Sequence, residues 1–459
     1  MKKKLAVLMA AVMGMSLLSG CSGGETAEQT AASETAADAG GTAAEEAGTG
    51  AEEASGEEKV VLNWLHRYPE ERYVDYFQGL ADSYMAEHPN VQINIEVVGD
   101  IAMKDKLKVM AGGGEMPDIF YSWPGEFAGQ FARNGMVLDL TPYIEADPEW
   151  KDSISDVFWD YVDMYDMHVG VPFRYSLSVM EYNKKIFEEC GVEVPATFSE
   201  LKEVCAVLKE HGYIPIAFGD NPNWPTAHYL TQMFPQFVGQ DVYEADCSAA
   251  TGTWTDPGYV EAIEALQDLV NSGCFNDNIN SLSYDQATLL FYEEKAAMLY
   301  GGSMAMETAA DELGDENLGW MKFPVADGAD GTLNTVCGGC DLFLVSSATE
   351  HPDEAVDFLK FITNKENQME LAKQTGLQPI AKDTITEETA HKLIVEFNDY
   401  TFDESDGITT WLDTAPESRI KEKFLENLML IIDGKDAGEV MKEIQEVAAA
   451  VREEFAEGN

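Results

Sequence analysis

The sequence predicts an α/β fold built as two lobes, and three observations lead to this prediction. Strand patterns and helix patterns alternate along the chain, which is typical of mainly parallel sheets flanked by helices. The alternation runs once before Gly170 and starts again after Ala196. The chain has 459 residues, a length for which two domains are the natural expectation.

The first run of elements follows from apolar periodicity, because alternation predicts strands and spacing of three or four residues predicts helices. The helix that begins near Tyr73 should end before Pro89, since proline does not continue a helix. On this basis we expect strands at 60–64, 91–97 and 117–123, and helices at 73–84, 102–110 and 125–133.

The second run repeats this order. Thr197 and Glu200 have the spacing of a capping box, which predicts the start of a helix, and Asp256-Pro257 predicts another start. Together the patterns predict strands at 214–218, 296–300 and 341–345, and helices at 201–210, 259–270, 352–361, 364–374, 421–432 and 438–454.

The segment Val169–Tyr175 separates the two runs. Pro172 fixes its own φ and favours extended geometry at Val171, and alternating apolar residues follow as far as Tyr182. The segment could be an ordinary loop and strand, or the first connection between two lobes. We favour the connection, with Arg174 and Tyr175 facing the cleft, and expect further crossings near 320–324 and 376–379.

The N-terminus reads as a targeting segment. Three lysines precede an apolar run that ends in Leu18-Ser19-Gly20-Cys21, and the run is too short to span a membrane comfortably. An ordinary signal peptide or a short membrane helix are the alternatives. The ending resembles the bacterial lipobox, which implies that Cys21 becomes a lipidated N-terminus. Residues 22–58 are low in complexity and free of aromatic residues, so we expect a disordered acidic linker.

Charge excludes several partners. The chain has 29 Lys and Arg against 83 Asp and Glu, a formal charge of −54. Such a field repels nucleic acids and anionic lipids, so we expect no nucleic-acid partner and membrane attachment only through the lipid. Polyanionic ligands are disfavoured as well, unless basic residues gather locally.

Motifs for metals, cofactors and catalysis are missing. The seven His residues form no helical metal pair, and the sequence has no phosphate-binding loop and no nucleophile elbow. Cys337-Gly338-Gly339-Cys340 has zinc spacing but lacks a second pair, so we expect two thiols or a local disulfide in a Gly-rich turn. The sequence therefore predicts no cofactor, no metal and no enzyme.

Several short motifs occur in a recognisable order. They are Pro117-Asp118-Ile119-Phe120, Gly170-Val171-Pro172, Tyr182-Asn183-Lys184, Ile186-Phe187-Glu188, Gly191-Val192-Glu193-Val194-Pro195, Glu294-Lys295-Ala296-Ala297-Met298 and His351-Pro352-Asp353-Glu354-Ala355. In this order they resemble the family 1 extracellular solute-binding proteins, the carbohydrate receptors of ABC importers. The resemblance spans about 59–454, with Glu294 where the family has Gly.

The resemblance implies a type II periplasmic-binding-protein-like fold, with lobes at 59–173 plus 325–376 and at 174–324 plus 377–459. It implies a monomeric, lipid-anchored receptor on the outer face of the cytoplasmic membrane, which delivers a sugar to an ABC permease. The alternatives are a surface glycoside hydrolase and a receptor for another solute, such as a polyamine.

Sugar binding requires aromatic rings for the C–H faces and polar groups for the hydroxyls. Such side chains are expected on loops beyond the strand ends, where the resemblance also places ligand contacts. Trp64 and Tyr68 could instead cap the first core, Arg174 could form a salt bridge, and Trp254 and Trp320 are expected in the core. The candidate ligand-binding residues are Trp64, Arg67, Tyr68, Trp123, Glu126, Arg174, Tyr175, Asn223, Trp224, Gly302, Ser303, Asp341, Trp411 and Asp413.

Overall fold

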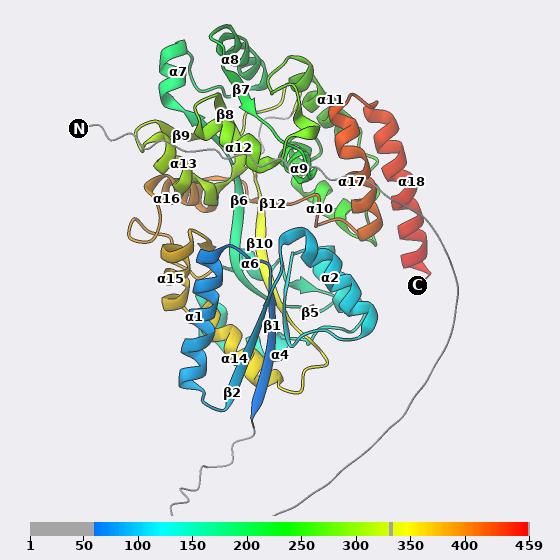
Figure 1. Cartoon of the computed structure of the whole chain (residues 1–459). Helices are drawn as coiled ribbons and strands as arrows, with labels where there is room; N and C mark the ends of the chain where they lie inside the picture. Colours follow the sequence, from blue (N-terminus) through cyan, green and yellow to red (C-terminus); the bar gives the residue numbers. More distant parts are fainter. Residues whose placement is uncertain (1–58, 330–333, 458–459) are drawn as a thin grey trace, which may run out of the picture. The chain divides into compact units, whose positions relative to one another are not determined.

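The computed structural model describes residues 59–329 and 334–457, where strands and helices alternate as the sequence predicts (Figure 1). The expected targeting segment, the lipidated Cys21 and the acidic linker lie outside the described residues. The predicted α/β fold class is confirmed, and the two long strands β6 (Val171–Asn183) and β10 (Val336–Val345) organise it.

The strands form one hydrogen-bonded path in the order β2-β1-β3-β10-β6-β8-β7. The pairs β1–β2, β1–β3 and β7–β8 are parallel, whereas β10 and β6 pair antiparallel with their neighbours on this path. The shorter strands β9 and β11 pair with β6, and β12 pairs with β10. The remaining strands are β1 (Val60–His66), β2 (Val91–Val97), β3 (Ile119–Ser122), β4 (Asp163–Met164), β5 (Met167–His168), β7 (Ile214–Ala217), β8 (Ala296–Gly302), β9 (Leu318–Met321), β11 (Gln378–Pro379) and β12 (Ile408–Thr410).

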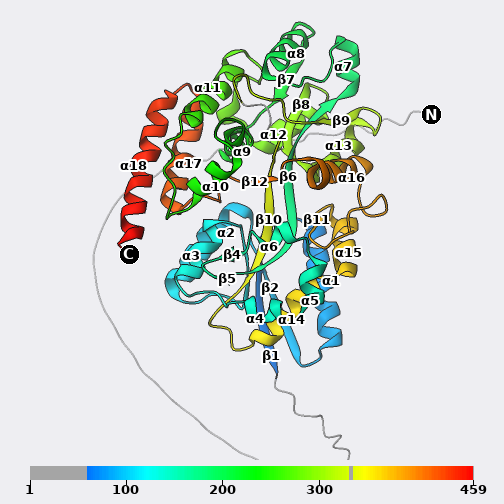
Figure 2. The same cartoon turned by 180° about the vertical axis from the view of Figure 1, so that it is seen from behind.

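The strand β6 connects two groups of elements, as Figure 2 shows from behind. Its first part pairs with β10 between Val171 and Leu177, and its second part pairs with β8 and β9 between Ser178 and Asn183. We call the elements around β1–β3 the first half and those around β7–β9 the second half. The expected crossing segment is therefore a strand that pairs with elements of both halves, which supports a connection over an ordinary loop and strand.

Helices cover both halves. Near the first half are α1 (Glu71–Glu87), α2 (Asp100–Gly113), α3 (Glu126–Arg133), α4 (Thr141–Glu145), α5 (Pro148–Ser153), α6 (Asp156–Trp159), α14 (Pro352–Thr363) and α15 (Lys365–Thr375). The others are α7 (Lys184–Cys190), α8 (Phe198–Glu210), α9 (Trp224–Val238), α10 (Gln240–Cys247), α11 (Gly258–Asn271), α12 (Tyr284–Tyr292), α13 (Met306–Leu313), α16 (Lys392–Asp399), α17 (Ser418–Ile432) and α18 (Ala437–Ala456). The Thr197 side chain accepts a hydrogen bond from Glu200 N and caps α8, as expected.

Buried apolar side chains form two cores. Phe77 and Phe343 belong to the first, and Trp254 and Phe424 belong to the second. Side chains of α12, α13 and α16 join the first core, although their residues fall within the expected second lobe. The lobe boundaries remain a prediction. Trp254 is fully buried as expected, whereas Trp320 is half-buried on β9.

Of the two alternatives for Cys337 and Cys340, the free thiols are confirmed, whereas the turn and the local disulfide are wrong. Both residues lie within β10 rather than in a turn, and both are buried free thiols. Successive side chains of a strand point to opposite faces, so residues three apart cannot face each other. The local disulfide is therefore excluded by the strand itself.

Candidate functional site

The two halves touch where loops and helices beyond the strand ends meet. The Lys104 ammonium of α2 lies 3.9 Å from the Asp413 carboxylate, and Lys108 lies 3.9 Å from Glu422 of α17. The backbone N–H of Glu126 donates to the carbonyl of Ala415. We call this region the junction, and its side chains are Arg67, Lys104, Trp123, Arg174, Trp224, His228, Tyr284, Asp341, Trp411, Asp413 and Lys421.

On the strands, the junction is held by a buried ionic cluster. Arg174 on β6 and Asp341 on β10 are opposite residues in the antiparallel pair, so their side chains lie together and form an ion pair. A register shift follows Asp341, and such irregularities re-aim side chains. Tyr68 donates to Asp341 at 2.6 Å and accepts from Arg174 Nε at 2.8 Å, while Arg67 lies 3.3 Å from Asp341.

The electrostatic state of Asp341 follows from its neighbours. Burial alone would raise its pKa, but Arg174, Arg67 and the Tyr68 hydrogen bond hold the pKa below its ordinary value. The carboxylate therefore stays ionised, with two guanidinium groups around it. One oxygen of Asp341 and the Nε of Arg67 are buried without a hydrogen-bond partner among the described residues.

Arg67 contacts both this cluster and the aromatic side chains of the first half. Its guanidinium lies 5.0 Å from the Tyr121 ring and 5.7 Å from the Trp123 ring. The Lys104 ammonium lies 4.8 Å from the same Trp123 ring. Cations over an indole are attracted to its π face, so Trp123 lies within reach of two cations.

The second half contributes a group of rings. Trp224 and His228 are four residues apart on α9 and therefore share one face, with ring centroids 4.8 Å apart. Trp224 also packs on Tyr284 at 4.7 Å, and His228 stacks on Trp411 at 6.0 Å. Trp224, His228 and Tyr284 are half-buried, so part of each ring remains accessible.

Two local details fix these rings. His228 Nδ1 lies 3.1 Å from the hydroxyl of Ser178, and burial lowers the pKa of His228 to about 4, so the ring is neutral at pH 7. The Trp411 ring lies against Gly339 of β10. A Cβ on Gly339 would come within 3.1 Å of that ring, so only glycine allows this approach without displacement.

Trp64 and Tyr175 lie in the first core, and the prediction of a ligand contact is corrected for both, whereas Glu126 lies at the junction with its side chain engaged locally. Trp64 is fully buried in the first core against Phe77, Phe343 and Phe358. Tyr175 stacks on Phe158 at 5.2 Å, because it follows Arg174 on a strand and points to the opposite face. Glu126 is engaged by Arg133 and by the Tyr165 hydroxyl.

Three further candidates serve local contacts. Asn223 donates to the carbonyl of Leu425 at 2.5 Å, and the buried Ser303 donates to Gln378 at 2.8 Å. The backbone N–H of Gly302 donates to the Tyr284 hydroxyl at 3.2 Å and thereby positions that ring. Trp224 is the first residue of α9 rather than a loop residue. The candidates brought together at the junction are Arg67, Trp123, Arg174, Trp224, Asp341, Trp411 and Asp413. Tyr68 is connected to them by its hydrogen bonds with Asp341 and Arg174.

Four junction residues were missed by the sequence analysis: Lys104, His228, Tyr284 and Lys421. The spacing of His228 from Trp224 was a signal available in the sequence. Lys104, Tyr284 and Lys421 lie on helices that only the tertiary fold brings to this place.

The described residues were also searched for metal-binding groups and membrane-spanning helices. Within 59–329 and 334–457, no three His, Cys, Asp or Glu side chains are grouped as a metal ion would require. In the same ranges, none of the helices has the length and apolarity that crossing a bilayer demands.

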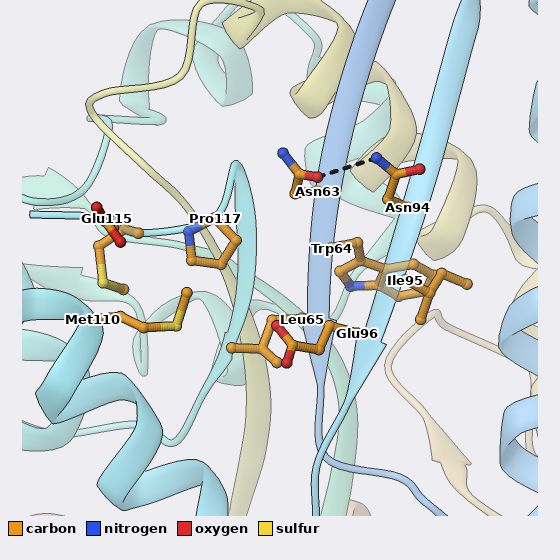
Figure 3. A pocket seen from close by; sticks show the side chains of 10 residues that line it. Asn63, Trp64, Leu65, Asn94, Ile95, Glu96, Met110, Glu115 and Pro117 are labelled. Carbon is orange, nitrogen blue, oxygen red and sulfur yellow. Dashed lines mark hydrogen bonds between the residues drawn. The ribbon is translucent and has the colours of Figure 1, made fainter. Parts of the chain in front are cut away.

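A surface cavity of about 330 Å³ lies beside β1 and β2, where Asn94 donates to Asn63 at 3.2 Å (Figure 3). None of the junction side chains lines it.

Comparison with known proteins gives consistent matches. The model of a family described as bacterial extracellular solute-binding protein matches residues 69–369. The maltotriose-binding protein of Pyrococcus abyssi is 28% identical over 338 residues, which cover 72% of this chain and 68% of the relative. A structure from work on xylan utilization by Caldanaerobius polysaccharolyticus has 25% identity and a TM-score of 0.76, covering 84% of this chain and 99% of its own. A chitin oligosaccharide binding protein has 23% identity and the same TM-score of 0.76, covering 86% and 99%, which shows the shared fold.

Proposed function

Because the chain belongs to the family of bacterial extracellular solute-binding proteins, we propose that it is a receptor for a sugar or oligosaccharide, which binds at the junction. The matched family and the maltotriose-binding relative are solute-binding proteins, so the chain is not an enzyme. The alternative of a surface glycoside hydrolase is therefore not supported. The sugar is supported by the maltotriose-binding relative.

The observation that carries the proposal is a set of contacts across the junction. Lys104 joins Trp123 to Asp413, and His228 joins Asp413 to Trp224 and Trp411. A pyranose presents an apolar C–H face that stacks on such rings, and a rim of hydroxyls that needs charged or polar partners. Asp413, half-buried beside Lys104 and His228, offers a carboxylate for hydroxyl groups. Micromolar affinity requires about 8 kcal/mol, which stacked rings and several hydrogen bonds can supply after ordering costs.

Binding is coupled to closure of the two halves. The ligand contacts both halves at once, so it stabilises the closed arrangement relative to the open one. The flexing segments are those where the chain passes between the halves, β6 and β10 among them. The closed receptor docks on an ABC permease, to which it delivers the sugar, and Cys21 carries the lipid that anchors it to the outer face of the membrane.

The experiment is a thermal-shift screen of the purified protein against neutral and acidic oligosaccharides, with spermidine as a non-sugar ligand. A binder raises the melting temperature because it stabilises the native state by mass action. Titration calorimetry then measures the affinity of the best ligand. A response to spermidine alone would replace the sugar by a polyamine.

Variants locate the site. Trp224→Ala and Trp123→Ala should each weaken binding by roughly tenfold or more, because each removes a stacking ring. Trp320→Ala is the matched control, since Trp320 packs on Phe397 and Tyr400 away from the junction rings. Unchanged titration curves for both junction variants would show that the sugar does not bind at the junction.

A further inference from the structure

Two lysines from opposite sides of the junction lie over neighbouring aromatic rings. The Lys104 ammonium of α2 is 4.8 Å from the Trp123 ring, and the Lys421 ammonium of α17 is 5.4 Å from the Phe127 ring. Trp123 and Phe127 pack edge to face with centroids 4.9 Å apart. The four side chains thus form a connected row, which we call the lysine row.

Neither ammonium group is well paired. Lys104 approaches Asp413 only to 3.9 Å, which is beyond hydrogen-bond distance. Lys421 is half-buried, and its ammonium makes no ion pair or hydrogen bond with the residues that the structure describes. The neighbouring lysines on the same helices differ, because Lys106 is 2.5 Å from Glu96 and Lys423 pairs with Glu426.

The ammonium groups of Lys104 and Lys421 carry the same charge and repel each other. Burial lowers the pKa of Lys421, and Lys104 and Lys108 lower it further, while Asp413 and Glu422 act in the opposite direction. Partly buried like charges destabilise the arrangement that brings them together. Contact between the halves therefore brings these two cations onto rings whose centroids are 4.9 Å apart, without a hydrogen-bonded carboxylate for either.

The acids nearby do not remove this excess. Asp341 is shared by Arg67 and Arg174, and Asp100 is also paired with Arg67. Five cations, Arg67, Arg174, Lys104, Lys108 and Lys421, thus lie near four acids, Asp100, Asp341, Asp413 and Glu422, in a chain whose formal charge is −54. A chain so acidic repels anions at a distance, so a local excess of cations is the condition under which it could bind one.

We propose that the sugar bound at the junction carries an anionic group, a uronate carboxylate or a sulfate ester, held between Lys104 and Lys421. This inference rests on the proposed function and names the class of its ligand. The anion neutralises the two ammonium groups when the halves close, so the ligand itself removes the repulsion. Charge-assisted hydrogen bonds to ammonium groups supply the specificity.

The test compares ligands that differ in charge alone. Titration calorimetry on the purified protein uses trigalacturonate, its methyl ester, a sulfated oligosaccharide and neutral oligosaccharides. We expect trigalacturonate or the sulfated sugar to bind at least roughly tenfold more tightly than its uncharged counterpart, with an affinity that falls as salt rises. The trigalacturonate and sulfate arms distinguish the two sources of the charge.

Variants assign the preference to the lysine row. Lys104→Gln and Lys421→Gln should each lower the ratio of charged to uncharged affinity by roughly tenfold, because each removes one cation. Lys106→Gln and Lys423→Gln are matched controls on the same two helices and should leave that ratio unchanged. Melting temperatures of all four variants show whether they are folded.

The outcomes separate this inference from the proposed function. Tighter binding of neutral sugars, or a preference for charge that survives both lysine substitutions, would overturn the anionic ligand and leave the sugar receptor standing. Binding of no sugar in either panel would overturn both.

Discussion

Two carboxylates buried on the long strands differ in their surroundings and in their charge. Asp341 on β10 is held by Arg67, Arg174 and Tyr68, and its pKa lies below the ordinary value despite burial. Glu181 on β6 belongs to the second half, where both of its oxygens lack a hydrogen-bond partner among the described residues. Burial raises the pKa of Glu181 to about 8, so this carboxyl is neutral at pH 7.

The difference shows that the ion-paired Asp341 keeps its charge at the junction, whereas Glu181, which has no partner among the described residues, is neutral in the second half. Asp220 follows the same rule as Glu181, since burial raises its pKa to about 7. A buried charge persists only where the fold supplies partners for it. At the junction, Arg67, Arg174 and Asp341 come from the first half and the crossing strands, while the second half adds Asp413 and Lys421 to its rings.

The largest effect on stability is expected from a substitution that breaks the Asp341 cluster. Asp341→Ala leaves two guanidinium groups without their shared carboxylate, and we expect a loss of about 3–5 kcal/mol in the free energy of unfolding. Urea denaturation measures this. Asp100→Ala removes only the outer partner of Arg67 and should cost about 1 kcal/mol or less. Equal losses would mean that Asp341 is no more important than a surface acid.

The next effect concerns pH and the unpaired Glu181. Its folded pKa lies above the ordinary 4.5, so the folded state holds a proton that the unfolded state releases between about pH 4.5 and 8. This contribution is fully present below pH 4.5 and is lost as pH rises to about 8, by at most about 1.4 kcal/mol per unit. Urea midpoints from pH 5 to 8 should fall less steeply in Glu181→Gln than in the parent protein. Parallel profiles would show that Glu181 is already ionised, and Glu293→Gln serves as the exposed control.

A smaller effect, on sugar affinity, tests whether the Trp411 ring contacts the ligand. Gly339→Ala puts a methyl group within 3.1 Å of the Trp411 ring and should displace the ring by a few tenths of an ångström. We expect affinity for the best sugar of the screen to fall roughly threefold or more, which is about 0.7 kcal/mol. Gly79→Ala on α1 is the control, since nothing lies within 4 Å of the added methyl. Unaltered affinity would show that the ligand does not contact Trp411.

The smallest effect concerns the exposed ion pair across the junction. Lys108 and Glu422 lie 3.9 Å apart, with side chains 61% and 60% exposed. Exposed pairs are worth about 0–1 kcal/mol, so Lys108→Gln should change neither the urea midpoint nor the sugar affinity appreciably. A large change would show that surface charge contributes to closure as much as the buried cluster does.

The sequence predicted the fold well because its signals are local. Alternating apolar residues marked the strands, and Pro172 marked β6 as extended before any tertiary information was available. The site was predicted in part. Trp123, Trp224 and Trp411 were chosen for their loop positions and polar neighbours and lie at the junction, where their binding role stays a prediction, whereas Trp64 is fully buried.

The remaining errors have different causes. Arg174 and Tyr175 were both assigned to the cleft, although adjacent residues of a strand point to opposite faces. Lys104 and Lys421 carry no local signal, since each is one lysine among several on an ordinary helix. Their proximity depends on how α2 and α17 pack, which is long-range information.

The strand β6 has a consequence for how the molecule melts. It supplies Phe173 to one core and Met180 to the other, and its backbone is hydrogen-bonded to β10 and to β8 along the way. Neither core can disorder without fraying a strand that the other requires. We therefore expect a single cooperative calorimetric transition, in which the calorimetric and van't Hoff enthalpies agree, from a body that contains two separate cores.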